Sequence, residues 1–241
     1  MCFSVNVNLV KEELENRYGA ILIDHDNYRP SYYYHAFAIP DIPVICSDDR
    51  SSIKLYKWGL IPSFIKNFED AESIRIKTFN ARAESISEKP AFSSLFRTKR
   101  CIVPVKGFFE WQHVGKEKVP WYIYHSENEI ISLAGLYDCW VFDKTGEVFN
   151  TFTIITTEAN DLLAEIHNSA RRMPAIIVPG DENSWLDSQK NDEDIYSMLK
   201  PSPVEMLKAH TIGPLVNKKN ADKNTPELIK PYLKPVQKGL F

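Results

Sequence analysis

The chain has 241 residues, of which 44% are hydrophobic and 25% are charged, and its formal net charge is −3. This composition is typical of a globular protein and excludes a disordered or collagen-like chain. The sequence holds no uninterrupted apolar stretch near the roughly 18 residues that a membrane-spanning helix needs. Because the chain is slightly acidic as a whole, any surface for nucleic acid must be local.

The amino-terminal residues and the cysteines indicate the cellular compartment of the protein. Lys11, Glu12 and Glu13 stand where a secretory signal would need an apolar core. We therefore expect a cytoplasmic protein with reduced thiols. The four cysteines form no C-x-x-C pair, and no cluster of His, Cys and Asp has ligand spacing, so we expect neither a metal nor an organic cofactor.

The first part of the chain alternates short regular elements with irregular ones. In chain order we expect a strand over 2–7, a helix on the spacing of Val10, Leu14 and Tyr18 that ends at Gly19, an irregular loop leading into a short strand over 28–46, and a strand over 53–58. A long segment with little periodicity follows, over 61–99.

Strand patterns dominate the second part. We expect strands over 101–105, 107–112 and 121–125 with a hairpin loop over 113–120, a hairpin of 130–142 and 147–156 around the turn 143–146, a helix over 158–166, a strand over 173–178, short helices near Trp185 and over 195–199, a strand over 204–210, and a Lys- and Pro-rich tail from Val216. Without βαβ alternation, this order predicts an α+β fold with a mostly antiparallel sheet or barrel. No linker divides the chain, so we expect one domain over 1–241.

Cationic residues are concentrated between Arg75 and Lys106. Eight basic residues lie there against two acidic ones, Glu84 and Glu88. Such a run is either a solvated face or a local surface for nucleic acid. Trp58, Phe64 and Phe79 lie in or near this run, and a mixture of cations and aromatic rings suits single-stranded nucleic acid, whose bases stack while its backbone is neutralised.

Cys2 is the most informative single residue. Methionine aminopeptidase removes Met1 when the second residue is small, and the mature chain would then begin with a cysteine. Its α-amine and its thiol are both partly available as nucleophiles near neutral pH. Together they form a 1,2-aminothiol, which condenses with an aldehyde to a five-membered thiazolidine; the same group could serve as the nucleophile of a hydrolase. A cysteine at this position can also be incidental.

Three further groups carry possible chemistry. Glu110 lies among aromatic residues in 107–111, where poor solvation of the carboxylate should raise its pKa and suit it to general acid–base catalysis, unless it points to solvent from an edge strand. His167 ends a helix and is followed by Arg171 and Arg172, which would suit an anionic ligand. Asn80 and Arg82 are two apart on an extended stretch and so share a face, where an amide could orient a substrate and a guanidinium could hold a phosphate.

Taken together, these segments occur in the order of one family. They are Met1-Cys2, Trp58-Gly59-Leu60-Ile61-Pro62, Asn80-Ala81-Arg82-Ala83-Glu84, Arg100-Cys101-Ile102-Val103-Pro104, Gly107-Phe108-Phe109-Glu110-Trp111, Ala134-Gly135-Leu136-Tyr137, Ile166-His167 and Arg172-Met173-Pro174. The chain resembles the SOS response-associated peptidase (SRAP) family of abasic-site processing proteins. The resemblance runs from residue 2 to about 217 and leaves 218–241 as a carboxy-terminal tail.

The resemblance implies a single domain with a β-barrel-like core and a positively charged groove that senses abasic sites in single-stranded DNA during the DNA-damage (SOS) response. The mature Cys2 would form a covalent thiazolidine with the ring-opened sugar, without a metal or cofactor, in a DNA-associated cytoplasmic monomer. Asn80 would position the amine or the sugar, Glu110 would shuttle protons, and His167 would act on the sugar hydroxyl or the imine.

The DNA contacts implied by the resemblance are Arg82 on a phosphate, Arg171 or Arg172 on another, and Trp58, Phe64 and Trp111 as stacking or wedging residues, with burial an alternative for the two tryptophans. The sequence departs from the commoner family pattern mainly here. Cys2-Phe3-Ser4 stands for Cys-Gly-Arg, Phe37-Ala38-Ile39-Pro40 for an Asn-x-x-Pro motif, Phe64 for a frequent Trp, and the His-x-Arg spacing is stretched between His167 and Arg172.

Two other functions remain open at the level of sequence. The first is a cysteine peptidase or amidase (a hydrolase that could remove its own Met1), with Cys2 as nucleophile and His167 or Glu110 as base. The second is a non-covalent single-strand-binding module, for which Cys2 would matter little. Only the covalent sensor, which would form and could reverse a DNA–protein cross-link in the manner of a lyase, needs both the thiol and a free α-amine.

Overall fold

The structure is a computed structural model that describes residues 2–127 and 129–233; Met1 lies outside the described residues, as does the end of the tail. Two sheets hold most of the chain. The strands are β1 (Ser4–Val7), β2 (Ile21–Leu22), β3 (Ser31–His35), β4 (Asp41–Cys46), β5 (Asp49–Trp58), β6 (Asn80–Arg82), β7 (Arg100–Val105), β8 (Gly107–Val114), β9 (Glu117–His125), β10 (Ile131–Phe142), β11 (Glu147–Glu158), β12 (Arg172–Pro174), β13 (Ile176–Ile177) and β14 (Leu207–Thr211). The α-helices are α1 (Lys11–Tyr18), α2 (Phe68–Arg75), α3 (Ser93–Thr98), α4 (Asp161–Ile166), α5 (Glu182–Trp185) and α6 (Asp192–Ser197).

The larger sheet closes into a barrel of five strands. Antiparallel pairs join β11 to β10, β10 to β7, β7 to β4 and β4 to β5. The ring is completed by a short parallel pair between β5 and β11, in which Lys57 lies opposite Thr151 and Trp58 opposite Phe152. The predicted α+β class with a mostly antiparallel, barrel-like core and peripheral helices is therefore confirmed.

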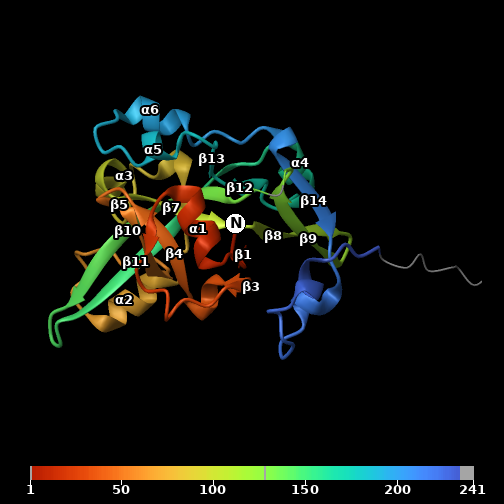
Figure 1. Ribbon diagram of the computed structural model, residues 1–241, viewed down its shortest axis with the longest axis horizontal. Coiled ribbons are helices and arrows are strands. Elements are labelled where there is room, and N and C mark those ends of the chain that lie inside the picture. Colours follow the sequence, from red (N-terminus) through yellow and green to blue (C-terminus); the bar gives the residue numbers. More distant parts are fainter. Residues whose placement is uncertain (1, 128, 234–241) are drawn as a thin grey trace, which may run out of the picture.

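The second sheet has the order β14-β9-β8-β1-β3, so β3 forms one of its edges. In Figure 1 its strands β8, β9 and β14 lie to the right of the barrel strands, and the amino-terminal end of the chain lies between the two groups. Strand β6 is a short additional strand of the larger sheet. It pairs in parallel with β11, with Asn80 opposite Ile154 and Arg82 opposite Thr156. Residues near position 2 and residues of β6 are thus brought to the junction of the sheets.

Local chemistry explains where the predicted helix begins and ends. The Glu13 carboxylate accepts a hydrogen bond of 2.9 Å from the backbone N–H of Val10 and caps the first turn of α1. Gly19 ends the helix in the left-handed region at φ 62°, and its N–H donates to the Glu15 carbonyl over 2.8 Å. Leu14 is buried in the core, as its position on the apolar face predicts.

Several elements differ from the sequence expectations. Residues 31–35 form strand β3 rather than an irregular loop, because β1 supplies an antiparallel partner for them. The expected loop over 113–120 shrinks to a tight turn at Gly115, since β8 and β9 pair as far as Val114 and Glu117. The weakly periodic segment 61–99 holds α2, β6 and α3.

No helix among the described residues is both long enough and apolar enough to cross a bilayer. Within the same ranges, no group of three or more His, Cys, Asp and Glu side chains is arranged to hold a metal ion.

Candidate functional site

Cys2 is joined to the barrel through Asn80. The Asn80 side-chain Nδ2 donates a hydrogen bond of 2.9 Å to the main-chain carbonyl of Cys2. The Asn80 Oδ1 is buried and has no hydrogen-bond partner among the described residues. Since buried polar atoms are nearly always satisfied, this oxygen marks an acceptor position beside the amino-terminal end of the chain.

Trp58 fixes Asn80 from inside the protein. Its ring is fully buried, stacks on Phe152, and donates from Nε1 to the Phe79 carbonyl over 2.9 Å. The next residue, Gly59, adopts φ 113° and leaves room for Arg75, because an added Cβ would come within 2.6 Å of that side chain. Trp58 therefore sets the path of the backbone just before Asn80, and no DNA contact is assigned to it.

Glu110 lies on β8 with its carboxyl group buried. Alternation along the strand directs its neighbour Phe109 to the opposite face, against Tyr122. Burial raises the pKa of Glu110 to about 8, so the group is largely protonated at neutral pH. The predicted apolar setting and raised pKa are confirmed, and the solvent-facing alternative is wrong.

His167 ends helix α4 close to that carboxyl group. Its Nδ1 lies 2.8 Å from the main-chain carbonyl of Arg172 and 3.9 Å from Glu110 Oε1. Because a carbonyl only accepts hydrogen bonds, Nδ1 carries the proton and Nε2 keeps its lone pair. Burial lowers the pKa of His167, which favours the same neutral form.

A clamp holds the His167 loop against β8. Asn168 Nδ2 donates to the His113 carbonyl over 2.9 Å, and the His113 N–H donates to Asn168 Oδ1 over 3.0 Å. Gln112 Nε2 adds a contact of 3.3 Å to the Glu165 carbonyl. This clamp could not be predicted from the sequence, since nothing in the local pattern indicates that residues 113 and 168 meet.

The chemical groups of this cluster are uncharged at neutral pH. Burial, followed by the negative charge of Glu110, raises the pKa of the Cys2 thiol. The thiol, the carboxylic acid of Glu110 and the imidazole of His167 are therefore all neutral in the resting protein. Such a cluster can transfer protons while it carries no negative charge. A negatively charged side chain at this place would repel an anionic substrate.

The predicted DNA-contacting residues fall into two groups. Arg82 and Arg171 are exposed, and Phe64 is 54% exposed. Arg82 shares its face of β6 with Asn80, while Ala81 between them is buried, as their spacing predicts. Trp111 is half-buried and donates from Nε1 to Asn217 over 3.0 Å.

Arg171 and Arg172 have different surroundings. Arg172 is held by Glu84 at 2.7 Å and by the Thr156 carbonyl at 2.7 Å, so its guanidinium is engaged within the protein. Arg171 adopts φ 51°, and its N–H donates to the His167 carbonyl over 2.7 Å. Of the two, Arg171 is the one whose side chain faces solvent.

The run of cations between Arg75 and Lys106 does not form one basic face. Five of its eight basic side chains are held by internal partners: Arg75 by Glu72, Arg97 by Asp192, Lys99 by Asp138, Lys106 by Glu13, and Arg100 by the main-chain carbonyls of Phe96, Arg97, Trp185 and Asp187. Arg100 is completely buried. Most of this local charge is therefore engaged with partners in the same chain.

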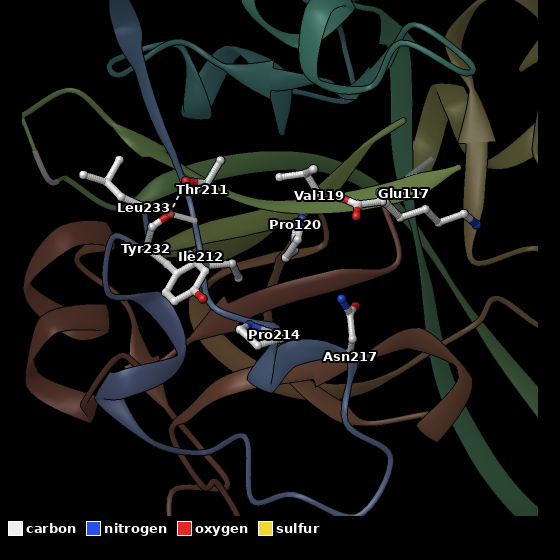
Figure 2. Close-up of a pocket in the computed structure, with 10 residues that line it drawn as sticks. Glu117, Val119, Pro120, Thr211, Ile212, Pro214, Asn217, Tyr232 and Leu233 are labelled. Atoms are coloured by element: carbon white, nitrogen blue, oxygen red, sulfur yellow. Dashed lines mark hydrogen bonds between the residues drawn. The ribbon is translucent and has the colours of Figure 1, made fainter. Parts of the chain in front are cut away.

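An apolar pocket of about 350 Å³ lies elsewhere, between β9, β14 and the segment that follows β14 (Figure 2). Pro120, Ile212 and Pro214 line it together with Tyr232, whose carbonyl accepts a hydrogen bond of 2.6 Å from Thr211. The predicted site residues do not line this pocket. It is formed where the carboxy-terminal segment packs on the edge of the second sheet.

Fold and site define an α+β barrel protein in which a cysteine at position 2 meets an asparagine, a buried carboxylic acid and a histidine from three other segments. The chain belongs to the family described as "SOS response associated peptidase (SRAP)", whose model matches residues 1–219. This finding confirms the resemblance deduced from the ordered motifs.

Named relatives and solved structures agree with this membership. The chain is 36% identical over 208 residues to the abasic site processing protein YoqW of Bacillus subtilis, covering 85% of this chain and 88% of that protein. It is 33% identical to the abasic site processing protein HMCES of Xenopus tropicalis, over 90% of this chain and 70% of that one. A crystal structure of a Bacteroides thetaiotaomicron protein superposes with a TM-score of 0.90 and 38% identity, covering 96% of this chain and all of that one.

Proposed function

We propose that this protein processes abasic sites in single-stranded DNA by capturing the exposed aldehyde covalently through Cys2. The observation that carries the proposal is the convergence of Cys2, Asn80, Glu110 and His167 from four separate segments of the chain. The names of the relatives YoqW and HMCES support the substrate. Removal of Met1 is part of the proposal, because only then does Cys2 carry a free α-amine.

The reaction balances with the groups present. The α-amine adds to the aldehyde carbon of the ring-opened sugar and gives a carbinolamine. Glu110, as a carboxylic acid, donates its proton to the carbinolamine hydroxyl, which leaves as water, and an iminium ion forms. The Cys2 sulfur then bonds to the iminium carbon and closes the thiazolidine ring, while its proton passes to the Glu110 carboxylate. Glu110 ends the cycle protonated, as it began.

The other two residues prepare the reactants. The Asn80 Oδ1 lacks a partner among the described residues and is suited to accept a hydrogen bond from the α-amine, while its Nδ2 holds the Cys2 carbonyl. The His167 Nε2 keeps a lone pair and is suited to accept the proton of the sugar C1 hydroxyl as the bond to the ring oxygen breaks, and to return that proton to the released ring oxygen.

Exposed side chains would hold the strand. Arg82 follows Asn80 on β6 and Arg171 lies in the loop after His167, so each can place a cation beside a phosphate. Phe64 offers an exposed ring for stacking, and Trp111 a half-exposed one. Arg172 is instead a positioning residue, whose carbonyl orients His167.

A denaturing gel tests the proposal. Protein whose free amino-terminal Cys2 has been verified by mass spectrometry is mixed with a single-stranded oligonucleotide that carries one abasic site. We expect a band that survives heat and detergent, requires the abasic site, and is lost in Cys2→Ala. An intact oligonucleotide is the control. Absence of the band with correctly processed wild-type protein would overturn the proposal.

Protein that retains Met1 separates this function from a thiol-dependent peptidase. Retained Met1 removes the free amine of Cys2 but leaves the thiol. Ring closure on an aldehyde needs both groups, so we expect no thiazolidine from the unprocessed protein. A peptidase that works through the thiol alone would tolerate the extra residue, and cleavage of peptide substrates by the unprocessed form would favour that alternative.

A further inference from the structure

A row of aromatic rings runs along the edge strand β3 to the start of the chain. Tyr33 and His35 alternate on β3 and therefore point to the same side, and Phe37 continues the row in the turn that follows. Ring centroids are 6.1 Å apart between Tyr33 and His35 and 5.4 Å apart between His35 and Phe37. Phe37 in turn lies 5.6 Å from Phe3. These four side chains are called the aromatic row below.

The inner end of the row touches both residues that anchor the site. Phe3 directly follows Cys2 in the chain. The ring of Phe37 lies 4.9 Å from that of Phe79, which precedes Asn80. His35 Nδ1 lies 2.9 Å from the Phe3 carbonyl and fixes the row to the backbone beside the nucleophile. A ligand lying along the row would therefore begin at the reacting group.

The row is open to solvent. Phe37 is 58% exposed, and Phe3, Tyr33 and His35 are each half-buried. Burial lowers the pKa of His35, so its ring is neutral at neutral pH and can stack as an aromatic plane. The Tyr33 and His35 rings are nearly parallel, at 14°. The exposed Phe37 ring beside three half-buried rings gives a surface on which planar bases can stack.

The outer end of the row carries positive charge. The Lys223 ammonium lies 4.9 Å from the centre of the Tyr33 ring. Lys218 and Lys219 belong to the same segment of the chain and are exposed. The Asn224 side chain accepts a hydrogen bond of 2.9 Å from the Tyr32 N–H and holds this segment against β3. Rings flanked by cations match a single strand, whose bases stack while its phosphates are neutralised.

We propose that Phe3, His35 and Phe37 form a stacking surface for the unpaired bases on one side of the abasic site, with Lys223 near the phosphates at its far end. This inference rests on the proposed function and adds a direction to it, since the strand would leave the reacting group along β3. Stacking on aromatic rings does not depend on base identity, so the surface would accept any sequence. If the aromatic row bound a peptide instead, the cross-linking rate would not depend on the bases that flank the abasic site.

The test uses full-length, Met1-processed protein and three oligonucleotides with one abasic site. In the first, both flanks carry natural bases. In the second and third, two tetrahydrofuran spacers, which lack both base and aldehyde, replace the nucleotides on the 5′ or the 3′ flank. Initial cross-linking rates are measured at protein concentrations well below saturation. For wild type we expect spacers on one flank to slow the reaction about tenfold, and spacers on the other flank to change it little.

The variant Phe37→Ala tests whether the aromatic row is the surface on which the bases stack. We expect it to slow cross-linking about tenfold on natural flanks and to abolish the effect of spacers on the sensitive flank, because the stacked bases have lost their partner. Phe37→Trp should restore both the rate and the dependence on bases. Ile21→Ala, which removes a side chain that is 63% exposed on β2, is the matched control and should behave as wild type.

The outcomes separate this inference from the proposed function. If Phe37→Ala still forms the heat-stable band at high protein concentration but responds to spacers as wild type does, the stacking surface is wrong and the covalent capture stands. Equal rates for wild type on all three oligonucleotides would also overturn the inference. Loss of the band in wild type on every oligonucleotide would overturn the proposed function instead.

Discussion

The side-chain amide of Asn80 donates a hydrogen bond of 2.9 Å to the main-chain carbonyl of Cys2. This single contact joins β6, which pairs with the barrel, to the residue that precedes β1 in the second sheet. The candidate site is therefore built across the junction of two sheets, and its geometry depends on how they meet.

Asn80→Ala tests the anchoring role. It removes a hydrogen bond that contributes about 1 kcal/mol and leaves the Cys2 carbonyl without its donor, so we expect the cross-linking rate to fall about tenfold. Asn16→Ala, on the exposed face of α1, is the control. The measurement is the initial rate on an abasic oligonucleotide, with the melting temperature of each variant recorded. A rate equal to wild type would show that the anchor is dispensable.

Glu110→Gln tests the buried acid through the pH dependence of stability. The pKa of Glu110 rises from 4.5 to about 8 on folding. Between these values the folded protein holds one more proton than the unfolded chain, so this group makes the free energy of unfolding fall as pH increases, by about 1.4 kcal/mol per pH unit. Below pH 4.5 its contribution is fully present.

The measurement is denaturant unfolding of wild type and Glu110→Gln at steps between pH 5 and pH 8. Because the amide does not titrate, the difference between the two curves isolates Glu110. We expect the stability advantage of wild type over the variant to shrink steadily across this range. Parallel curves would contradict a raised pKa. The variant should also lose cross-linking, since an amide cannot return a proton to the reaction.

Arg171 and Arg172 should respond differently to substitution. Arg172→Lys breaks a two-pronged contact to Glu84 and Thr156, and we expect a loss of about 1–3 kcal/mol of stability. Arg171→Asn keeps a residue that tolerates φ 51° and should leave stability unchanged. For DNA binding we expect Arg171→Asn to reduce the salt slope by about 0.7, the value for one contact to single-stranded phosphate. Thermal melting and binding titrations at several salt concentrations would distinguish the two residues.

Trp58 and Phe64 form a second contrasting pair. Trp58→Ala would open a cavity in the barrel and remove the hydrogen bond to the Phe79 carbonyl, so we expect destabilisation of about 3–5 kcal/mol. Phe64→Ala removes an exposed ring and should change stability by less than about 0.5 kcal/mol while weakening DNA binding. Reversed results would mean that Trp58, rather than Phe64, lies on the DNA surface.

The local sequence pattern predicts those elements whose structure depends on residues close together in the chain. The turn at 143–146 and the Gly19 helix end depend on residues near in sequence, and both lie where expected. Strand β3 was missed because its proline-flanked aromatic residues become a strand only by pairing with β1, more than twenty residues earlier. Pairing between strands so far apart in the sequence cannot be predicted from the local sequence pattern.

In the candidate site as well, some features follow from the local sequence pattern and others depend on contacts between distant segments. The aromatic neighbours of Glu110 indicated an apolar setting, but alternation left a solvent-facing side chain open. Glu110 is buried because β8 lies between β1 and β9 and is buried on both faces over 107–110. The engagement of Arg172 with Glu84 and the burial of Arg100 could not be predicted, since charge runs alone do not show which cations meet internal acceptors. The aromatic row required both β3 and its contact with Phe3.

The contact from Asn80 ends on a main-chain carbonyl, which every amino acid possesses. Replacement of Cys2 therefore removes the thiol without releasing the hydrogen bond that holds this end of the chain. Under the proposed function, a variant with serine or alanine at this position is expected to stay folded and to bind the abasic site without closing a thiazolidine ring on it.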